Sequence, residues 1–418
     1  MLFFTTLGLT HVVVAALSAA ADAAAPEPTF EANVPVRAIT QGPKSHWFAY
    51  YDKLQFDPTN RYVLGMEVDF DNRTNTADDV IKLGYIDLEK GDAWTEFAQT
   101  TAWCWQQGCM LQWLPGSDTK VIYNVREDGQ YKSVIQDVFS GEKRTLPKPV
   151  YAVSPTGRQA VGLNFARVGM TRPGYGYYGI PDPGADNLHP ADDGLYVMDL
   201  DTGDSKLLFT LDQISQYELE PDPEAGKHWF NHLLFNTDGT RFIFLHRWHR
   251  TAESTKGWHT RMLTAAVDGS GLDIVADHDM VSHFIWKNPK QILAWSREPE
   301  EGDRFHLYTD QSDEVEVIGD GVLKQDGHCT YSPDREWVLT DTYPSKERMQ
   351  GLMLYRPSDG RLEMLGKFYL PKEQSGEIRC DLHARWSRDG RCACIDSMHM
   401  GGQRQLYLID LSSIVKPQ

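Results

Sequence analysis

Four histidines recur at one position of a repeated sequence pattern. Each stands three residues before an apolar or aromatic anchor, and together they are His232, His283, His328 and His383. The chain has 14 histidines among 418 residues, so four at successive equivalent positions are hard to assign to chance. Imidazole is a common ligand of transition metals. The spacing therefore predicts a divalent metal site, with Zn²⁺ and Mn²⁺ both compatible; the alternative is a polar channel whose histidines hydrogen-bond one another.

The elements that must position these histidines are short strands. Alternating apolar runs are separated by turn signals such as "SPTG", "NTDG", "SPDR" and "SRDG", as a series of hairpins requires. A second hairpin lies between most copies of the unit, which makes four strands per repeat. Seven copies align on the anchors Phe56, Trp113, Val153, Phe235, Trp286, Tyr331 and Trp386.

This pattern predicts an all-β protein, a seven-bladed β-propeller of four-stranded antiparallel blades, with residues 26–418 as its single domain. The first strand of each blade lines the channel of a propeller, so the four histidines should converge there. The last blade ends one strand short at "QLYLIDLSSIV". We expect an N-terminal strand around Val36 to Thr40 to complete this blade and close the ring.

Composition narrows the class of partner. Residues 1–25 form an apolar run that ends in small residues, which predicts a secretory signal peptide and a secreted protein. A formal net charge of −18 disfavours nucleic acid, and no later segment is long and apolar enough to span a membrane. Six cysteines in an oxidising compartment allow disulfides whose pairing stays open. We expect a monomer.

Several polar and aromatic residues outside the histidine series are candidates for a sugar site. Arg172, Tyr175 and Tyr177 lie in a Gly/Pro/Tyr-rich insertion typical of a functional loop. Trp105 is a candidate for stacking on a sugar ring, although a core pair with Trp103 is the alternative. His246, in "LHRW", is a candidate base at the end of a strand, and alternation places Arg247 on the opposite face.

The hairpins "FNHLLF", "LHRW", "VSHFIW" and "CDLHARW" give the chain a family likeness. It resembles the β-propeller polysaccharide lyases, and within that group the oligogalacturonide, ulvan and rhamnose–glucuronate lyases. The oligogalacturonide type is a metal-bound variant whose pattern maps best onto His283 and His383. Those enzymes have a histidine where this chain has Asp381.

The ulvan-lyase type is similar in a different part of the chain. It opens its third blade with a tyrosine followed by an arginine at the spacing of Tyr151 and Arg167, since 167 − 151 = 16. Its second-blade histidine is replaced in this chain by the segment that contains Gln106, which we take as a candidate substrate contact.

The resemblance implies a lyase that cleaves a bond 4-linked to a glucuronate or galacturonate by β-elimination. Arg167, a metal or both would neutralise the substrate carboxylate, and Tyr151 would act as base, acid or both. His246 is the second candidate base. The substrate would be a uronate-containing poly- or oligosaccharide. Two other functions stay open: a non-catalytic glycan- or protein-binding propeller of the TolB type, and a metal-dependent propeller hydrolase.

Overall fold

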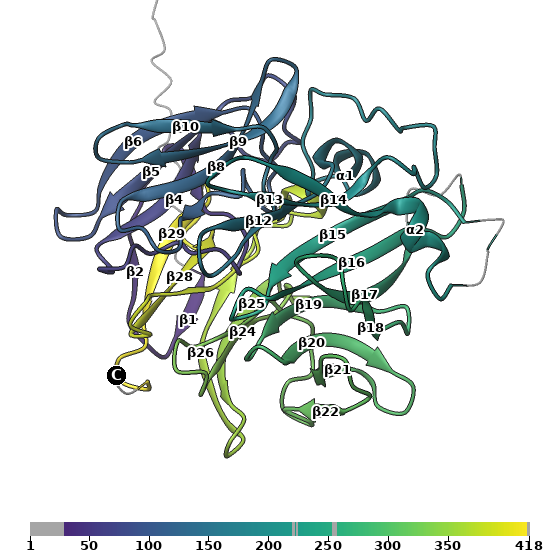
Figure 1. The fold of residues 1–418 in the computed structure, drawn as a ribbon. Coiled ribbons are helices and arrows are strands. Elements are labelled where there is room, and N and C mark those ends of the chain that lie inside the picture. Colours follow the sequence, from purple (N-terminus) through teal and green to yellow (C-terminus); the bar gives the residue numbers. More distant parts are fainter. Residues whose placement is uncertain (1–28, 220–221, 223–224, 253–256, 416–418) are drawn as a thin grey trace, which may run out of the picture.

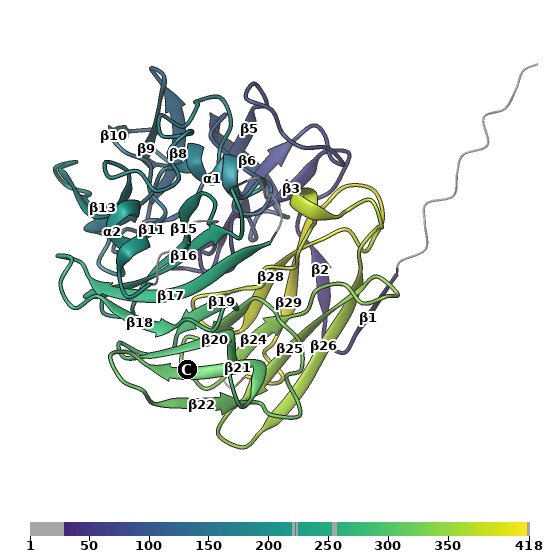
Figure 2. The same cartoon turned by 90° about the vertical axis from the view of Figure 1, so that its right-hand side faces the viewer.

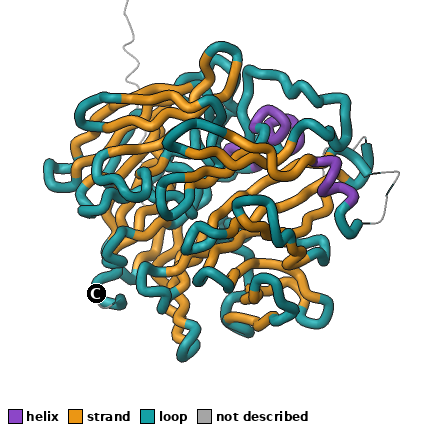
Figure 3. The backbone as a smooth tube through the Cα atoms, viewed as in Figure 1, coloured by secondary structure: helices purple, strands orange, loops and turns teal. Residues whose placement is uncertain are grey.

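The computed structural model describes residues 29–219, 222, 225–252 and 257–415. The expected signal peptide at 1–25 lies outside these residues. The described strands form seven antiparallel sheets that make a seven-bladed β-propeller, as predicted (Figure 1). Strands dominate the tube in Figure 3, with short helices on one side of the molecule.

The first three blades each have four strands, which follow one another from one edge of the sheet to the other. Blade one contains β3 (Ser45–Trp47), β4 (Tyr62–Val68), β5 (Ile81–Asp87) and β6 (Ala93–Thr100). Blade two contains β7 (Gln112–Trp113), β8 (Lys120–Glu127), β9 (Gln130–Asp137) and β10 (Lys143–Leu146). Blade three contains β11 (Ala152–Val153), β12 (Gln159–Gly162), β13 (Gly194–Asp199) and β14 (Ser205–Thr210).

Blades four and five follow the same order. Blade four contains β15 (His228–Phe235), β16 (Arg241–His249), β17 (Trp258–Ala266) and β18 (Asp273–Ala276). Blade five contains β19 (Val281–Trp286), β20 (Gln291–Glu298), β21 (Gly302–Thr309) and β22 (Val315–Ile318).

The last two blades each take a strand from the start of the chain (Figure 2). Blade six contains β23 (Cys329–Tyr331), β24 (Val338–Asp341), β25 (Met349–Arg356), β26 (Arg361–Tyr369) and the added strand β1 (Phe30–Ala32). Blade seven contains β27 (Arg385–Trp386), β28 (Cys392–Ser397), β29 (Gln405–Asp410) and β2 (Val36–Ala38). β2 pairs with β29, with Val36 opposite Ile409, whereas the strand β1 was not expected.

The turn between the first two strands of a blade is fixed by one recurrent side chain. In five blades a short polar residue opens the turn and accepts a hydrogen bond from the backbone N–H five residues later, which favours the turn over an extended chain. These residues are Asp57, Ser154, Asn236, Ser332 and Ser387.

The innermost strands are irregular where the histidines lie. The ladder between β15 and β16 shifts register between Asn231 and Leu234, and the ladder between β19 and β20 shifts between Val281 and Phe284. His232 and His383 have φ angles of 51° and 43°, which is uncommon for residues other than glycine. Such irregularities turn a side chain out of its alternating position and occur often beside functional sites.

The Gly/Pro/Tyr-rich insertion lies between β12 and β13. It begins with helix α1 (Phe165–Thr171), which the Asn164 side chain caps by accepting from the N–H groups of Ala166 and Arg167. Gly176 packs so closely on this helix that a Cβ there would meet the Gly169 nitrogen at 2.0 Å. The other helices are α2 (Leu211–Gln216) and the 3₁₀ turn η1 (Gly376–Ile378).

Two further expectations concern the whole chain. The six cysteines are all free in this structure, so the possible disulfides are not formed. Among the described residues no helix has the length and apolarity that crossing a membrane requires.

Candidate metal centre and substrate site

Three of the four repeated histidines lie against one another. The ring centroids of His283 and His328 are 4.1 Å apart, and those of His328 and His383 are 4.2 Å apart. The rings come from the start of blades five, six and seven, and each residue is at most 3% exposed. The repeat register therefore brings these three side chains together.

Carboxylates orient two of these rings from behind. Asp326 Oδ1 lies 2.8 Å from Nδ1 of His283, and Asp341 Oδ1 lies 2.9 Å from Nδ1 of His328. Asp341 also accepts the backbone N–H groups of His328 and His383. A carboxylate on Nδ1 fixes the tautomer and leaves Nε2 as the nitrogen that can bind a metal.

The residues fit a metal ion. The Nε2 atoms of His328 and His383 are buried and have no hydrogen-bond partner, which is costly unless another ligand satisfies them. His328, His383 and Asp381 each offer a ligand atom, and these atoms lie within 4.8 Å of one another. His283 adjoins this group, with its Nε2 at 3.4 Å from the Tyr343 hydroxyl. Two imidazoles and a carboxylate suit Zn²⁺ or Mn²⁺.

The charges in this cluster are set by burial and close partners. Burial lowers the pKa of His283 despite Asp326, and burial with the neighbouring His328 holds the pKa of His383 well below its usual range. Burial also opposes charge on His328, but Asp341 outweighs it and raises the pKa of that residue. Burial would raise the pKa of Asp381, yet the Arg379 guanidinium, at 2.5 and 2.6 Å, brings the pKa below its usual value.

His232 lies beside this group rather than within its shortest contacts. Its ring stacks on Tyr50 with centroids 5.1 Å apart, and Nδ1 lies 3.4 Å from the amide nitrogen of Gln107. Tyr50 also contacts the rings of His383 at 4.9 Å and His328 at 5.6 Å, and its hydroxyl is buried without a partner. Tyr50 therefore links the fourth histidine to the other three.

Two arginines lie on the His232 side of the cluster. The Arg172 guanidinium carbon is 4.6 Å from the Tyr175 ring centroid and 4.5 Å from that of Trp258, and the Arg172 Nε is buried without a partner. Arg247 donates to Thr260 Oγ1 and to the Val281 carbonyl, and lies 5.7 Å from Trp258. Neither forms an ion pair with a described carboxylate within 4 Å, so both charges remain available to an anionic ligand.

Burial and neighbouring charges shift the pKa values of Arg247 and His232. Burial lowers the pKa of Arg247 to about 10, with Arg172 adding to the shift. Burial and then Arg247 hold the pKa of His232 well below its usual range, so this imidazole is neutral. Tyr175 completes the group, with its ring centroid 5.7 Å from that of His232 in an edge-on arrangement.

Tyr151 lies next to this region, but its hydroxyl group is already hydrogen-bonded to other protein groups. Its hydroxyl, on a side chain that is 1% exposed, contacts both polar atoms of Gln107 at 2.8 and 2.9 Å and accepts the His232 N–H at 3.1 Å. Burial and the charge of Asp52 raise the pKa of Tyr151 well above its usual value. This environment opposes the tyrosinate that a base would require; Tyr151 is suited to hold His232 and the Gln107 amide in place.

Arg167 does not meet the expectation that it neutralises a substrate carboxylate. Its five N–H donors are used by Asp182 Oδ2 and by backbone carbonyls of His228, Gly184, Asn187 and Leu188. The side chain is 1% exposed. Arg167 therefore secures the insertion to blade four, and no donor remains for a ligand.

His246 is not placed as a base would need to be. It lies within β16 rather than at a strand end, and both ring nitrogens are occupied, by His228 Nδ1 at 2.9 Å and Arg261 Nε at 3.1 Å. Burial and the neighbouring His228 hold the pKa of His246 well below its usual range. Arg247, expected on the opposite face, is the residue of this pair that reaches the histidine cluster.

Three of the expected sugar contacts are structural. Gln106 donates to the carbonyls of Glu377 and Arg379, which attaches the η1 segment to blade two. Trp105 packs in the core with its ring centroid 5.1 Å from that of Trp103, and Tyr177 stacks on Phe165 at 4.2 Å. Their exposed fractions of 1–2% leave no surface for a sugar.

Sequence reasoning missed Tyr50 as a site residue. With Phe56 as the anchor of blade one, the position three residues before it is Lys53. The structure begins the blade at β3, and only a bridge between Phe56 and Val63 continues the pairing. Lys53 instead pairs with Asp52 at 2.8 Å. The adjacent tyrosines Tyr50 and Tyr51, shortly before the anchor Phe56, were the available signal.

The fold and the cluster define a seven-bladed β-propeller with histidines and carboxylates grouped on its innermost strands. No family model matches the chain, and no curated protein sequence matches it. Among solved structures it is similar to an oligogalacturonate lyase from Vibrio parahaemolyticus, at 12% identity and a TM-score of 0.64 over 93% of this chain and 98% of that one.

A second similar structure is an oligogalacturonate lyase in complex with manganese, at 14% identity and a TM-score of 0.63 over 92% of this chain and 96% of that one. The β-propeller domain of the Trilobed protease from Pyrococcus furiosus is also similar, at 12% identity and a TM-score of 0.50 over 87% and 96%. At these identities the comparisons establish a shared propeller fold.

Proposed function

We propose that the protein is a metal-dependent lyase that acts on a uronate-containing poly- or oligosaccharide. The observation that carries the proposal is the pair of buried, unpartnered Nε2 atoms of His328 and His383 beside Asp381. Arg172 and Arg247, which pair with no described carboxylate within 4 Å, lie on the His232 side of the cluster, where they could bind an anionic sugar. The manganese complex of a similar lyase structure supports a divalent metal in this fold.

In this proposal the metal is held by His328, His383 and Asp381, with His283 as a fourth ligand. A bound divalent ion supplies positive charge that stabilises the negative charge developing on the substrate carboxylate. Arg172 and Arg247 bind and orient the same carboxylate, because a planar guanidinium matches its geometry. They take the role that the sequence assigned to Arg167.

The proton transfers fall to neighbouring side chains. We assign the C5 proton to His232, which is 7% exposed; burial lowers its pKa, so it is a weak base that depends on the metal and the arginines to make the C5 proton more acidic. Tyr175 is 5% exposed and lies between His232 and Arg172, where its hydroxyl can protonate the departing 4-oxygen. Tyr151 and Gln107 position His232 from behind.

The decisive assay follows the ultraviolet absorbance of the unsaturated uronate that β-elimination creates. We expect absorbance to rise with at least one glucuronate- or galacturonate-containing glycan, to stop after chelation, and to return with Mn²⁺ or Zn²⁺. Reducing ends that appear without absorbance would identify the metal-dependent hydrolase instead. Binding of a glycan without any cleavage would support the non-catalytic propeller.

The arginine assignment is tested in the same assay. Arg247→Met should lower kcat/KM by about 100-fold, since it removes charge stabilisation from the transition state. Arg391→Met is the matched control, because this exposed arginine lies in the hairpin turn of blade seven. Equal activity of the two variants would contradict the role of Arg247.

A further inference from the structure

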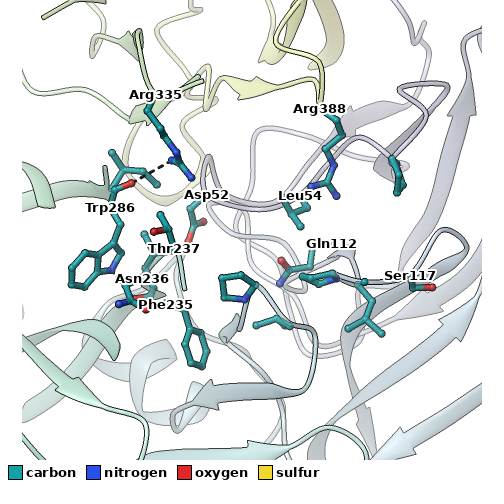
Figure 4. A pocket seen from close by; sticks show the side chains of 18 of the residues that line it. Asp52, Leu54, Gln112, Ser117, Phe235, Asn236, Thr237, Trp286, Arg335 and Arg388 are labelled. Atoms are coloured by element: carbon teal, nitrogen blue, oxygen red, sulfur yellow. Dashed lines mark hydrogen bonds between the residues drawn. The ribbon is translucent and has the colours of Figure 1, made fainter. Parts of the chain in front are cut away.

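The channel has a second polar site at the end opposite the histidines. The innermost strands run from the histidine positions to the hairpin turns, and three residues of strand span about 10 Å. A cavity of about 670 Å³ lies at this turn end (Figure 4), lined by residues of several blades. Its volume lies within the range of small-molecule sites.

Two buried polar side chains in this cavity have unsatisfied atoms. Asp52 has a side chain that is 6% exposed, and its Oδ1 is buried without a hydrogen-bond partner. Gln112 is 4% exposed, and its Nε2 is likewise unpartnered. Buried polar atoms are normally satisfied, so a donor and an acceptor left open in one cavity point to a ligand.

Two arginines extend toward the same space from blades six and seven. Arg335 donates to the Trp286 carbonyl at 3.4 Å through Nη1, and Arg388 donates to the Phe56 carbonyl at 2.9 Å through Nε. No carboxylate among the described residues pairs with either guanidinium within 4 Å. Figure 4 shows both guanidinium groups directed toward the region between Asp52, Leu54 and Gln112.

The remaining walls are mainly apolar, including Leu54, Val153, Phe235 and Ile285. Asp52 offsets one positive charge, but its Oδ2 is already paired with Lys53, and Asp118 lies exposed at the rim. The cavity therefore combines cationic donors with an apolar surface, in a protein whose formal net charge is −18.

We infer that this cavity binds a small organic carboxylate with an apolar body. The carboxylate lies between Arg335, Arg388 and the Gln112 amide, and the apolar body packs on the side chains from blades three to five. Asp52 accepts a hydrogen bond from a hydroxyl group of the ligand. This site is independent of the proposed lyase chemistry, since none of its residues belongs to the histidine cluster.

The test uses four probes on the full chain, measured by calorimetry and ligand-observed NMR. Benzoate carries the carboxylate and the apolar body but no hydroxyl group, methyl benzoate lacks the charge, acetate lacks the apolar body, and inorganic phosphate is the alternative anion. We expect benzoate to bind at least about tenfold more tightly than each of the other three. Equal binding of methyl benzoate, tighter binding of phosphate, or no saturable binding of benzoate would overturn the inference.

Variants locate the binding. Arg388→Met should weaken benzoate by about tenfold, and Arg391→Met, in the same turn but outside the cavity lining, should leave it unchanged. An unchanged affinity in Arg388→Met would also overturn the inference. The comparison of benzoate with its ester needs no variant, so the test holds even if Arg388→Met folds poorly.

Discussion

Arg167 and Arg247 have opposite roles because their environments differ. All five N–H donors of Arg167 are bonded to one carboxylate and four backbone carbonyls. Arg247 has no described carboxylate partner and lies beside the neutral imidazole of His232. The same holds for the histidines. His246 has both nitrogens occupied, and His383 has a buried Nε2 with no partner. Availability of a donor or acceptor, rather than residue type, separates structural from chemical roles in this protein.

The metal assignment is tested by elemental analysis of purified protein. His328→Ala and His383→Ala should each lower the bound metal by at least about tenfold, because each removes one ligand of a small set. His278→Ala is the matched control, since His278 is a partly exposed histidine outside the cluster. Full metal content in both cluster variants would contradict the site.

His399 makes stability depend on pH. Its ring is 1% exposed among Phe30, Phe368 and Tyr407, and burial lowers its pKa to about 4. The unfolded chain takes up the proton near pH 6.5 and the folded chain only near pH 4, so stability falls as pH falls through this window. The free energy of unfolding should lose about 3 kcal/mol from this group.

The measurement is denaturant unfolding of wild type and His399→Phe at pH 7 and pH 4.5. Phenylalanine fits an aromatic pocket and does not titrate, so the variant should lose less stability on acidification. The difference between the two proteins isolates His399 from the other groups that titrate. Parallel losses in both proteins would show that His399 does not cause the effect.

At the scale of elements, the insertion after β12 positions two side chains of the proposed substrate site. Its helix α1 is held by Arg167, and its end delivers Arg172 and Tyr175 to the cluster. The η1 segment is held from blade two by Gln106, and it precedes Arg379 and Asp381. Arg167 and Gln106, which the sequence suggested as substrate contacts, are therefore the residues that position these loops.

This division predicts different phenotypes for two arginine variants. Arg167→Met should lower the free energy of unfolding by about 3 kcal/mol, because it leaves Asp182 and several carbonyls buried without a partner. Arg247→Met should change stability much less and instead raise KM or lower kcat. Thermal unfolding and steady-state kinetics on both proteins provide the comparison, and loss of activity without destabilisation in Arg167→Met would contradict it.

At the scale of the whole molecule, the first two described strands pair with the last two blades. β1 pairs with β26, with Phe30 opposite Phe368, and β2 pairs with β29. These two strands cover the outer edges of the last two blades, which would otherwise expose unpaired backbone groups.

A chain that begins at Ile39 should therefore be less stable than one that begins at Thr29. Losing both edge strands removes ladder hydrogen bonds worth about 1 kcal/mol each and exposes edges that aggregate. Thermal unfolding and size-exclusion chromatography of the two chains test this expectation. Equal unfolding temperatures and equal monomer fractions would show that the edge strands contribute little.

Much of this organisation was predictable from local sequence. Turn residues such as Asn236 and Ser332 act within five residues of themselves, so their spacing revealed seven blades and the register of His283, His328 and His383. In blade one the repeat register did not identify the site residue, because the inner strand is displaced to β3 and Tyr50 enters the site through an irregular segment.

The propeller can be read from the amino-acid order alone, because turn chemistry and strand alternation are short-range. The convergence of histidines from successive blades was also predicted, because equivalent repeat positions share one axis, but the sequence predicted four and His232 lies beside the other three. The polar groups that remain free are set by long-range packing instead. Arg167 is saturated by carbonyls on residues 184, 187, 188 and 228, and Arg247 is not. Whether a side chain has hydrogen-bond partners depends on residues distant in the sequence, so a local sequence pattern cannot predict it.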